Sequence, residues 1–440
     1  DDRMANGFVL ERYTKRLVFE NDRKFEVANK QIVLKVFMAD SMLYWICATK
    51  IKRSAIKVIV HSVSASLIGD ISVTEIGTYN TGDIDIDQFE VASSPDKRRW
   101  VILGFGTAGQ RTREALGTEV WMLRADVDGG EARSSFILTS ERWSPADLTW
   151  KSVVLDDSGK VFAIYEDKDY GGTGLLGGHK QLNHFHWVKS GGDSLMRGDL
   201  VVEGDVLDAV AVLHTKTQAL QVFGYYNAGK GVGMDGYFIG EFGDDGQIAT
   251  SNHPFTESAA KQFMGLGSLK RNERPDNYYI RNVVALSNGG WLMLSEQFYE
   301  SRQMETYYVN GVPQTSSKLF YHYGDIAMQY LQKDGTLDSL IMVRKTQVGA
   351  VNVAHLFGFG MYVCGSSINL LYNDDEGEIN RIMHVKIDKS FKVERDWLFR
   401  NENTPGTIVP YEGKQTDYGL ITLPIYRDKQ WFWLQVFSND

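Results

Sequence analysis

The stretch VLDAVAVLHTKTQALQVFGY, residues 206–225, decides the fold class. It contains an apolar run from Val206 to Leu213, a polar turn, and a second apolar run from Ala219 to Tyr225. Two short runs rich in Val, Phe and Tyr around a polar segment are typical of a β-hairpin. The stretch therefore predicts two neighbouring antiparallel strands.

The same pattern occurs seven times along the chain. The other strand pairs are 32–38 with 43–48, 86–92 with 100–105, 152–155 with 161–165, 280–286 with 291–295, 350–357 with 361–365, and 418–425 with 431–436. A third strand is expected in six units, at 56–60, 119–123, 184–188, 236–240, 325–330 and 382–387. The unit recurs every 60 to 70 residues or so, and such a period is typical of a β-propeller.

We therefore predict an all-β fold, a single β-propeller of about seven blades covering residues 1–440. The predicted parts are closing strands within 1–30 and repeat units at about 31–85, 86–149, 150–205, 206–278, 279–349, 350–416 and 417–440. Strand-like segments at 16–20 and 24–28 are expected to pair with residues 418–436. This pairing would close the ring and cover sheet edges that otherwise promote aggregation.

Composition excludes some functions and leaves others open. The net charge is −9 and Lys and Arg are scattered, so we expect no nucleic-acid partner. No apolar run approaches the roughly 20 residues that span a bilayer, so we predict no transmembrane segment in this chain. The chain begins Asp1-Asp2-Arg3, which suggests a processed or truncated product. Cys47 and Cys364 fit buried free thiols or a disulfide, and the sequence does not choose between them.

Several motifs resemble ligand sites without completing them. Gly104-Phe105-Gly106-Thr107-Ala108-Gly109 follows a strand like a dinucleotide fingerprint, but no adequate crossover helix follows it. A near phosphate loop at 224–230 has Gly231 where Ser or Thr is needed. The acidic segments 83–87 and 373–378 do not complete a calcium loop. We predict no cofactor.

Two pairs of residues are the candidates for chemistry. His184 and His186 share one strand face and are the candidate metal ligands, although the sequence places no third ligand beside them. Glu296 and Asp325 interrupt apolar strands and are the candidate catalytic residues. Because buried carboxylates need partners, we expect them to pair with Arg344 or Lys345. A structural network is favoured over a carboxylate pair that cleaves glycosidic bonds.

The stretch around these carboxylates resembles a group of uncharacterised envelope β-propeller proteins from Bacteroidota. The shared elements are Glu296-Gln297-Phe298, Tyr321-His322-Tyr323-Gly324-Asp325-Ile326, Lys333-Asp334-Gly335 and Lys345-Thr346-Gln347. The match covers about 70 residues. It implies an exported protein that is periplasmic or associated with the outer membrane, such as a lipoprotein, and it implies no catalytic residue.

Two functions are compatible with these observations. The favoured one is a non-catalytic binding or scaffold propeller of the cell envelope, with a protein partner that contacts large loops such as 300–318 and 170–181. The alternative is a propeller that binds or cleaves glycans, with abundant Trp and Tyr and with Glu166, Asp167, Asp169 and Glu296 near blade ends. Whether the protein is an enzyme stays open, with the balance against it.

Overall fold

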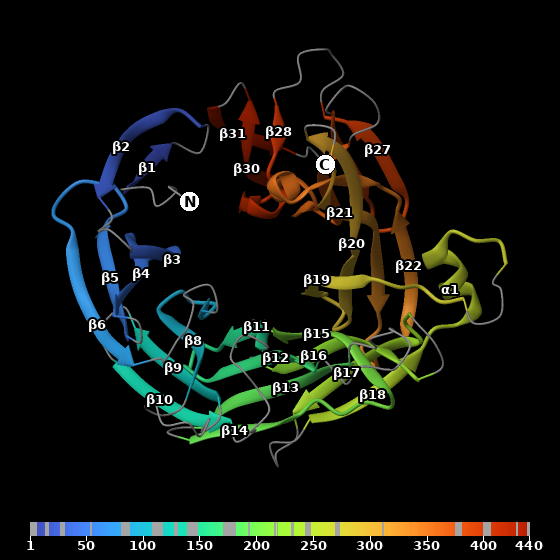
Figure 1. Ribbon diagram of the computed structural model, residues 1–440, viewed down its shortest axis with the longest axis horizontal. Helices are drawn as coiled ribbons and strands as arrows, with labels where there is room; N and C mark the ends of the chain where they lie inside the picture. The colour runs from blue at the N-terminus through green and yellow to red at the C-terminus, as the bar shows by residue number, and fades with distance from the viewer. Residues whose placement is uncertain are drawn as a thin grey trace. The chain divides into compact units, whose positions relative to one another are not determined.

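The computed structural model describes most of the chain. The described residues are 7–13, 17–26, 31–52, 55–80, 89–107, 118–126, 131–138, 148–169, 182–191, 194–214, 217, 219–229, 233–242, 248–268, 273–309, 312–374, 381–398, 406–427 and 430–437. They form two compact units, an N-terminal unit (Asp1–Pro254) and a C-terminal unit (Phe255–Asp440). Each unit consists mainly of antiparallel sheets (Figure 1).

The N-terminal unit contains one two-stranded sheet and four four-stranded sheets among its described residues. The small sheet has β1 (Gly7–Tyr13) and β2 (Phe19–Glu26). The next two sheets have β3 (Gln31–Ala39), β4 (Met42–Lys52), β5 (Ala55–Ser64) and β6 (Ser72–Asn80), then β7 (Glu90–Ser93), β8 (Arg99–Thr107), β9 (Thr118–Asp126) and β10 (Glu131–Leu138). The last two have β11 (Leu148–Leu155), β12 (Val161–Asp169), β13 (Leu182–Gly191) and β14 (Ser194–Asp199), then β15 (Asp205–Leu213), β16 (Leu220–Asn227), β17 (Gly236–Phe242) and β18 (Ile248–Pro254).

The C-terminal unit begins with helix α1 (Glu257–Met264) and continues with three sheets in its described part. The first has β19 (Tyr278–Ala285), β20 (Trp291–Val309), β21 (Val312–Leu331), β22 (Leu337–Val343) and β23 (Gln347–Ala350). The 3-10 helix η3 (Val351–Leu356) leads to the second, with β24 (Gly360–Cys364), β25 (Ser367–Asp374), β26 (Arg381–Ile387) and β27 (Val393–Trp397). The third has β28 (Thr407–Ile408), β29 (Lys414–Asp417), β30 (Leu420–Arg427) and β31 (Gln430–Phe437), with η4 (Pro410–Glu412) between β28 and β29.

Within each unit, successive sheets pack face to face through apolar side chains. In the N-terminal unit, Ile46 and Val58 of the β3–β6 sheet pack with Trp100 of the β7–β10 sheet. In the C-terminal unit, Leu294 of β20 packs with Leu370 of β25. Each sheet thus places apolar side chains on a face that meets a neighbouring sheet, which explains the alternating apolar pattern of its strands.

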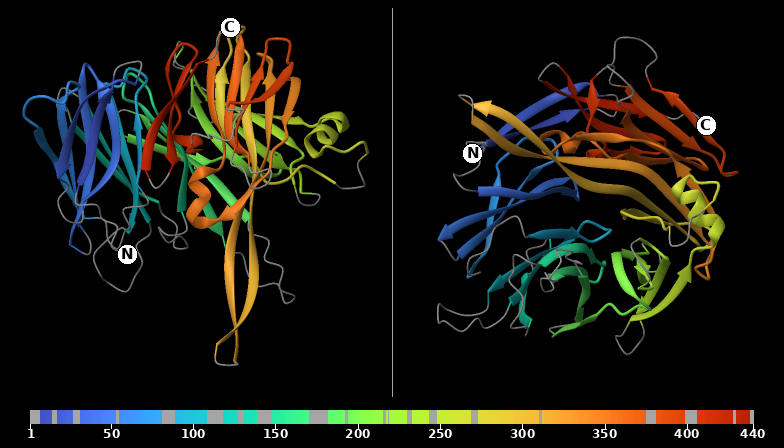
Figure 2. Two further views of the ribbon diagram at one scale, coloured as in Figure 1. Left: turned by 90° about the horizontal axis from the view of Figure 1, so that it is seen from above. Right: turned by 45° about the vertical axis from the view of Figure 1, so that its right-hand side comes forward.

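The hairpin formed by β20 and β21 extends well beyond its own sheet. Pairing of β20 with β19 ends at Gln297, whereas pairing of β20 with β21 continues to Val309 and Val312. β23 reaches β21 only as far as Phe320. Beyond these points the two strands form a ribbon about 35 Å long, taken at about 3.3 Å per residue. Figure 2 shows this ribbon projecting from the strands of the C-terminal unit.

The predicted all-β class is confirmed, and most predicted strands lie where expected. The predicted strand 350–357 is wrong, because most of this segment is the 3-10 helix η3. A short apolar run fits a strand or a helical turn equally well, so the pattern could not separate the two. The run 361–365 is consequently part of the first strand of its sheet, β24, and its partner is β25.

The last sheet also differs from the prediction. Runs 418–425 and 431–436 correspond to β30 and β31, but the short strands β28 and β29 pair with β30 ahead of them. These two strands lie before or at the boundary predicted at 417. The sheet therefore begins earlier than predicted, because Pro410 and η4 interrupt its first strand and leave no continuous apolar run.

Within the two segments predicted as closing strands, 16–20 and 24–28, the strand residues that the structure describes fall in one strand, β2. β2 pairs with β1, and the buried ring of Phe25 packs edge-on against Trp45 of β4, with ring centroids 4.7 Å apart. No ladder between residues 16–28 and 418–436 is found among the strand pairings of the described residues. Closure of the ring therefore stays a prediction.

The described residues also show the helix α1, the two cysteines and the extent of the acidic segments. Helix α1 is capped at its N-terminus by Thr256 and ends at Gly265. No helix among the described residues is long and apolar enough to cross a membrane. Cys47 and Cys364 are both buried, and they do not form a disulfide. The acidic segment 83–87 lies outside the described residues.

Candidate functional site

Glu296 is at the centre of a buried polar cluster in the C-terminal unit. It lies on β20 at a β-bulge, where the register with β21 shifts between Glu296 and Phe298. Its neighbours in the strand ladder are apolar, and the residue itself is 0 % exposed. A carboxylate in such a place requires charged partners and hydrogen-bond donors, because an isolated buried charge is very costly.

Three side chains from three elements supply those partners. The Nζ of Lys345 lies 2.8 Å from Oε1 of Glu296, and Nε of Arg281 lies 3.2 Å from Oε2. The hydroxyl of Tyr411, in η4, donates to the same Oε2. Arg281 comes from β19, and Lys345 from the connection between β22 and β23. The carboxylate is therefore held by two cations and one hydroxyl.

Lys345 carries this network toward the second sheet of the unit. Burial lowers the pKa of Lys345, and the charge of Glu296 opposes that effect. The Nζ of Lys345 also donates to Oε1 of Gln347 at 2.8 Å, and Nε2 of Gln347 donates to the carbonyl of Asn373 at 2.7 Å. Gly358 N donates to Oε1 of Gln347 at 2.9 Å. The cation is thus fully engaged inside the protein.

Asn373 joins the second sheet to the third. Its Nδ2 donates to the carbonyls of Leu356 at 2.6 Å and of Ile408 at 2.7 Å, and its Oδ1 accepts from Ile408 N at 3.0 Å. The residue is buried at the end of β25. Asn373, the first residue of the acidic segment 373–378, is therefore a buried structural residue, while residues 375–378 lie outside the described part.

Aromatic rings cover the outer side of the Glu296 cluster. The guanidinium carbon of Arg281 lies 5.6 Å from the ring centre of Tyr411 and 6.0 Å from that of Tyr323. Burial, and after it the charge of Glu296, raises the pKa of Tyr411 above the usual tyrosine range. Tyr411 therefore stays protonated and acts as a donor to Glu296, which does not suit it to nucleophilic attack.

Asp325 belongs to a second, adjoining network. It forms an ion pair with Arg344 and accepts a hydrogen bond from Lys345 N at 3.1 Å. Arg344 also donates to the carbonyls of Phe263 at 2.9 Å and Gln262 at 2.5 Å, at the C-terminal end of α1. A cation is favourable at that end because the helix dipole is negative there. The expected pairing of the two carboxylates with Arg344 and Lys345 is confirmed.

This arrangement explains structure better than catalysis. A pair of carboxylates that cleaves a glycosidic bond must face a substrate, one as acid and one as base or nucleophile. Glu296 has no exposed surface, and its partners occupy both of its oxygens. Asp325 is partly exposed but is held by Arg344. Sequence reasoning did not find Arg281 and Tyr411, since neither belongs to a recognisable motif.

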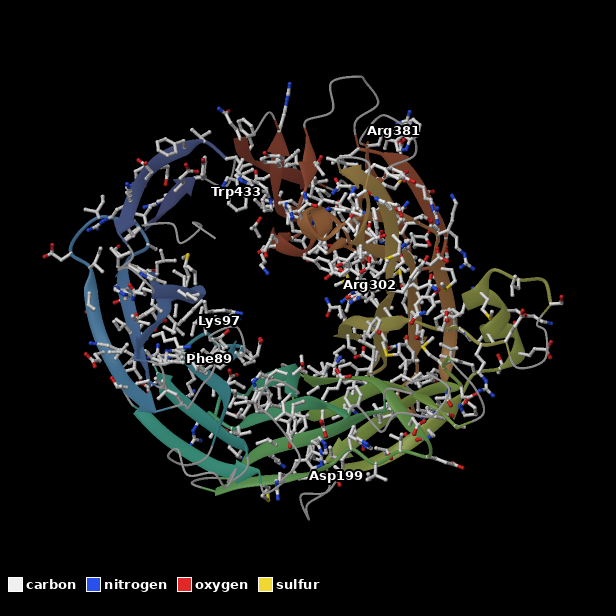
Figure 3. The ribbon with its side chains drawn as sticks, viewed as in Figure 1. Phe89, Lys97, Asp199, Arg302, Arg381 and Trp433 are labelled. Atoms are coloured by element: carbon white, nitrogen blue, oxygen red, sulfur yellow. The ribbon has the colours of Figure 1, made fainter. Side chains whose placement is uncertain are left out.

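The histidine pair does not form a metal site in the described structure. His186 is buried, and its Nδ1 lies 2.8 Å from Oδ1 of Asp199, a residue labelled in Figure 3. Its ring stacks on Tyr165 with centroids 5.0 Å apart. His184 is exposed. Among the described residues, no group of three His, Cys, Asp or Glu side chains could hold a metal ion.

The other carboxylates predicted for glycan chemistry are also built into the fold. Glu166 on β12 is buried, and its Oε2 lies 2.6 Å from Nζ of Lys151. Asp167, the next residue of β12, is buried as well. The side chain of Asp169 lies outside the described part. These residues therefore present no exposed pair of carboxylates.

Comparisons with known proteins identify no family. No protein-family model matches the chain, and no curated protein matches it. Three similar solved structures are a protein of unknown function from Dyadobacter fermentans, an alpha-L-arabinofuranosidase from Lactobacillus brevis, and the β-propeller domain of the Trilobed protease from Pyrococcus furiosus.

These likenesses are weak. The Dyadobacter protein has 10% identity and a TM-score of 0.33 over 83% of this chain and 92% of its own. The arabinofuranosidase has 12% identity and a TM-score of 0.32 over 75% and 94%. The protease domain has 9% identity and a TM-score of 0.30 over 86% and 100%. At such values they carry no argument about function.

Proposed function

We propose that the protein is a non-catalytic binding β-propeller that presents the β20–β21 ribbon to a protein partner. The ribbon, defined as residues 299–309 and 312–320, is the observation that carries this proposal. Met304 is 67% exposed, Tyr308 is 73% exposed and Val312 is 59% exposed. Apolar side chains on a projecting two-stranded element cost solubility unless they serve an interface.

The ribbon also offers two strand edges to a partner. Beyond Gln297 and Phe320, β20 and β21 pair only with one another among the described strands. Backbone N–H and C=O groups on such edges can accept an extended segment of another protein as an added strand. We therefore propose a partner that supplies a strand and apolar side chains that pack on Met304 and Tyr308.

A capture experiment tests this proposal. Tagged protein carrying a photo-crosslinker at position 306 is exposed to envelope extracts of the source organism. We expect one dominant adduct, which disappears in the Met304→Ser/Tyr308→Ser variant. The matched control is Gln303→Ser/Gln314→Ser, which alters the opposite face of the ribbon. An adduct that survives the apolar variant, or that the control removes equally, contradicts the proposal.

Glycan binding is a second candidate, favoured by aromatic side chains on the last sheet of the C-terminal unit. Tyr426 and Trp431 are opposite one another across β30 and β31, with ring centroids 4.9 Å apart, and Trp433 lies two residues farther along the same face. Trp431 is 56% exposed and Trp433, labelled in Figure 3, is 46% exposed. Exposed aromatic faces suit sugar rings.

A glycan array distinguishes the two candidates. Binding that Trp431→Ala/Trp433→Ala abolishes and Tyr418→Ala preserves would support the glycan candidate. Silence across the array would leave only the protein-partner proposal. Cleavage of a glycan is not proposed, because the candidate carboxylates Glu166, Asp167 and Glu296 are buried and Asp325 is paired with Arg344.

We also propose an overall architecture and a cellular location for the protein. The seven larger sheets of the described chain are proposed to be the blades of one propeller, closed when residues 16–28 pair with residues 418–436. Cysteine pairs placed along β2 and β31 test this, since closure predicts oxidative cross-linking in one register. An exported, envelope-associated location is proposed from the resemblance, and fractionation of source cells tests it.

A further inference from the structure

We propose that the N-terminal unit binds a small amphipathic carboxylate in a pocket between two of its sheets. The pocket lies between the β11–β14 sheet and the β15–β18 sheet and has a volume of about 380 Å³. Pockets of roughly 300–1,000 Å³ are the usual size for small ligands. The site is independent of the ribbon and of the Glu296 cluster.

Apolar side chains form the inner wall of the pocket. Phe162 and Phe242 meet edge to face, with ring centroids 4.6 Å apart, and Val154 and Leu220 also line the space. All four belong to the apolar contact between the two sheets. The inter-sheet core therefore opens to solvent here, at the ends of the β11–β12 and β15–β16 hairpins, instead of closing over.

Two lysines line the pocket together with these apolar side chains. Lys160 and Lys189 both line the pocket, and the Nζ of Lys189 lies 4.7 Å from the ring centre of Phe242. The ammonium of Lys189 is thus held against an aromatic ring at the edge of an apolar cavity.

Each of the two carboxylates of the pocket accepts hydrogen bonds from neighbours at one of its oxygens. Oδ1 of Asp156 accepts from Ser158 N at 2.9 Å, from Ser158 Oγ at 2.7 Å and from Lys160 N at 2.8 Å, within its own turn. Oε1 of Glu241 accepts from Nε2 of Gln221 at 2.8 Å. The pocket thus combines apolar walls, two carboxylates that are hydrogen-bonded at one oxygen each, and two ammonium groups that can receive an anion.

This combination selects a ligand class. The aromatic and aliphatic wall fits a hydrocarbon chain or ring, and the ammonium groups fit a carboxylate at its end, because charge-assisted hydrogen bonds are the strong ones. A neutral ligand of the same shape would fill the wall but leave both lysines without an anion. Preference for the acid over its amide is therefore the property that identifies the site.

The experiment measures octanoate and octanamide binding to the full-length protein by isothermal titration calorimetry. We expect one octanoate per chain and at least about tenfold weaker binding of octanamide, in line with the loss of a charged hydrogen bond. Lys189→Gln should remove this preference, whereas Lys24→Gln, an exposed lysine on β2, should leave it intact. Ala219→Trp, which fills the pocket, should abolish binding of both compounds.

Three results would overturn the proposal. They are equal affinity for the acid and the amide, an unchanged preference in Lys189→Gln, and binding that persists in Ala219→Trp. Absence of octanoate binding at millimolar concentration would overturn it as well. Circular dichroism of each variant shows whether the fold is intact, and Lys160→Gln provides a second charge-removing variant should Lys189→Gln fail to fold.

Discussion

Replacement of Glu296 by leucine should lower the free energy of unfolding, because it removes the carboxylate partner of the buried Lys345. The side chain of Lys345 is 1% exposed. Without Glu296 its ammonium would keep the 2.8 Å hydrogen bond to Gln347 and the rings of Tyr323 and Tyr372, each with its centre 5.9 Å away, but no carboxylate partner. Arg281, with a side chain 28% exposed, can turn toward water. The destabilisation by Glu296→Leu therefore comes mainly from the unpaired charge of Lys345. Breaking a buried ion pair in this way lowers the free energy of unfolding by about 3–5 kcal/mol.

Deprotonation of Lys345 sets an upper limit on this cost. The ordinary lysine pKa is 10.5. Giving up the proton at pH 7 costs roughly 5 kcal/mol, and at pH 9 only about 2 kcal/mol, at 1.36 kcal/mol per pH unit. A lysine whose pKa is lower in the folded state than in the unfolded state loses stability as pH falls and regains it as pH rises. The destabilisation by Glu296→Leu should therefore shrink between pH 7 and pH 9.

Urea unfolding followed by tryptophan fluorescence at pH 7, 8 and 9 measures this trend relative to the wild type at each pH. The Glu296→Leu/Lys345→Met variant removes both charges and should recover most of the loss with no pH trend. Glu394→Leu, which breaks the exposed Lys392–Glu394 pair, should leave the midpoint unchanged. A single-variant cost below about 1 kcal/mol, or a double variant as unstable as the sum of the two singles, would refute this account.

Three further outcomes follow from the geometry. Burial lowers the pKa of His186 below 6.5. The neutral imidazole therefore contributes fully to stability above pH 6.5, and this contribution declines as the pH falls through the folded-state pKa. Urea midpoints of the His186→Gln variant should consequently fall less steeply with acid than those of the wild type. Gly358→Ala should lower the free energy of unfolding, measured by thermal unfolding, by about 1–3 kcal/mol more than Gly69→Ala does. Both glycines have positive φ, but an added Cβ at Gly358 would meet the ring of Tyr411 at 2.3 Å, whereas one at Gly69 would have nothing within 4 Å. Arg344→Gln should cost about 1–3 kcal/mol in urea unfolding, since Asp325 and the end of α1 both lose a charged donor; equal stability of variant and wild type would contradict that role.

The sequence predicted the inner strands of most sheets and missed many outer ones, for a physical reason. Inner strands such as β8 and β16 carry apolar runs because both of their faces are buried. Outer strands such as β18 and β27 are half exposed and carry polar residues, so no apolar run marks them. β25 was missed because it begins with Ser367 and ends with polar residues.

Part of the candidate site could likewise be predicted from the sequence, and part of it could not. The pairing of Glu296 with Lys345 could be predicted because a carboxylate inside an apolar strand needs a nearby cation. Tyr411 could not be predicted, since it is 115 residues away along the chain and lies in a short 3-10 helix. A contact of this kind depends on how sheets pack, which strand periodicity does not encode. The exposed ribbon was predicted as a loop because its polar residues hide the strand pattern.

The division between buried networks and exposed surface bears on where function should be sought. The sequence elements that contain Glu296, Tyr323, Asp325, Lys345 and Gln347 supply the buried networks and their aromatic cover. Residues that hold three sheets together are constrained by packing, whatever the protein binds. The ribbon between those elements, and the pocket in the N-terminal unit, are free of that constraint. Binding specificity can therefore vary there without disturbing the network, and the capture and calorimetric experiments are directed at those two places.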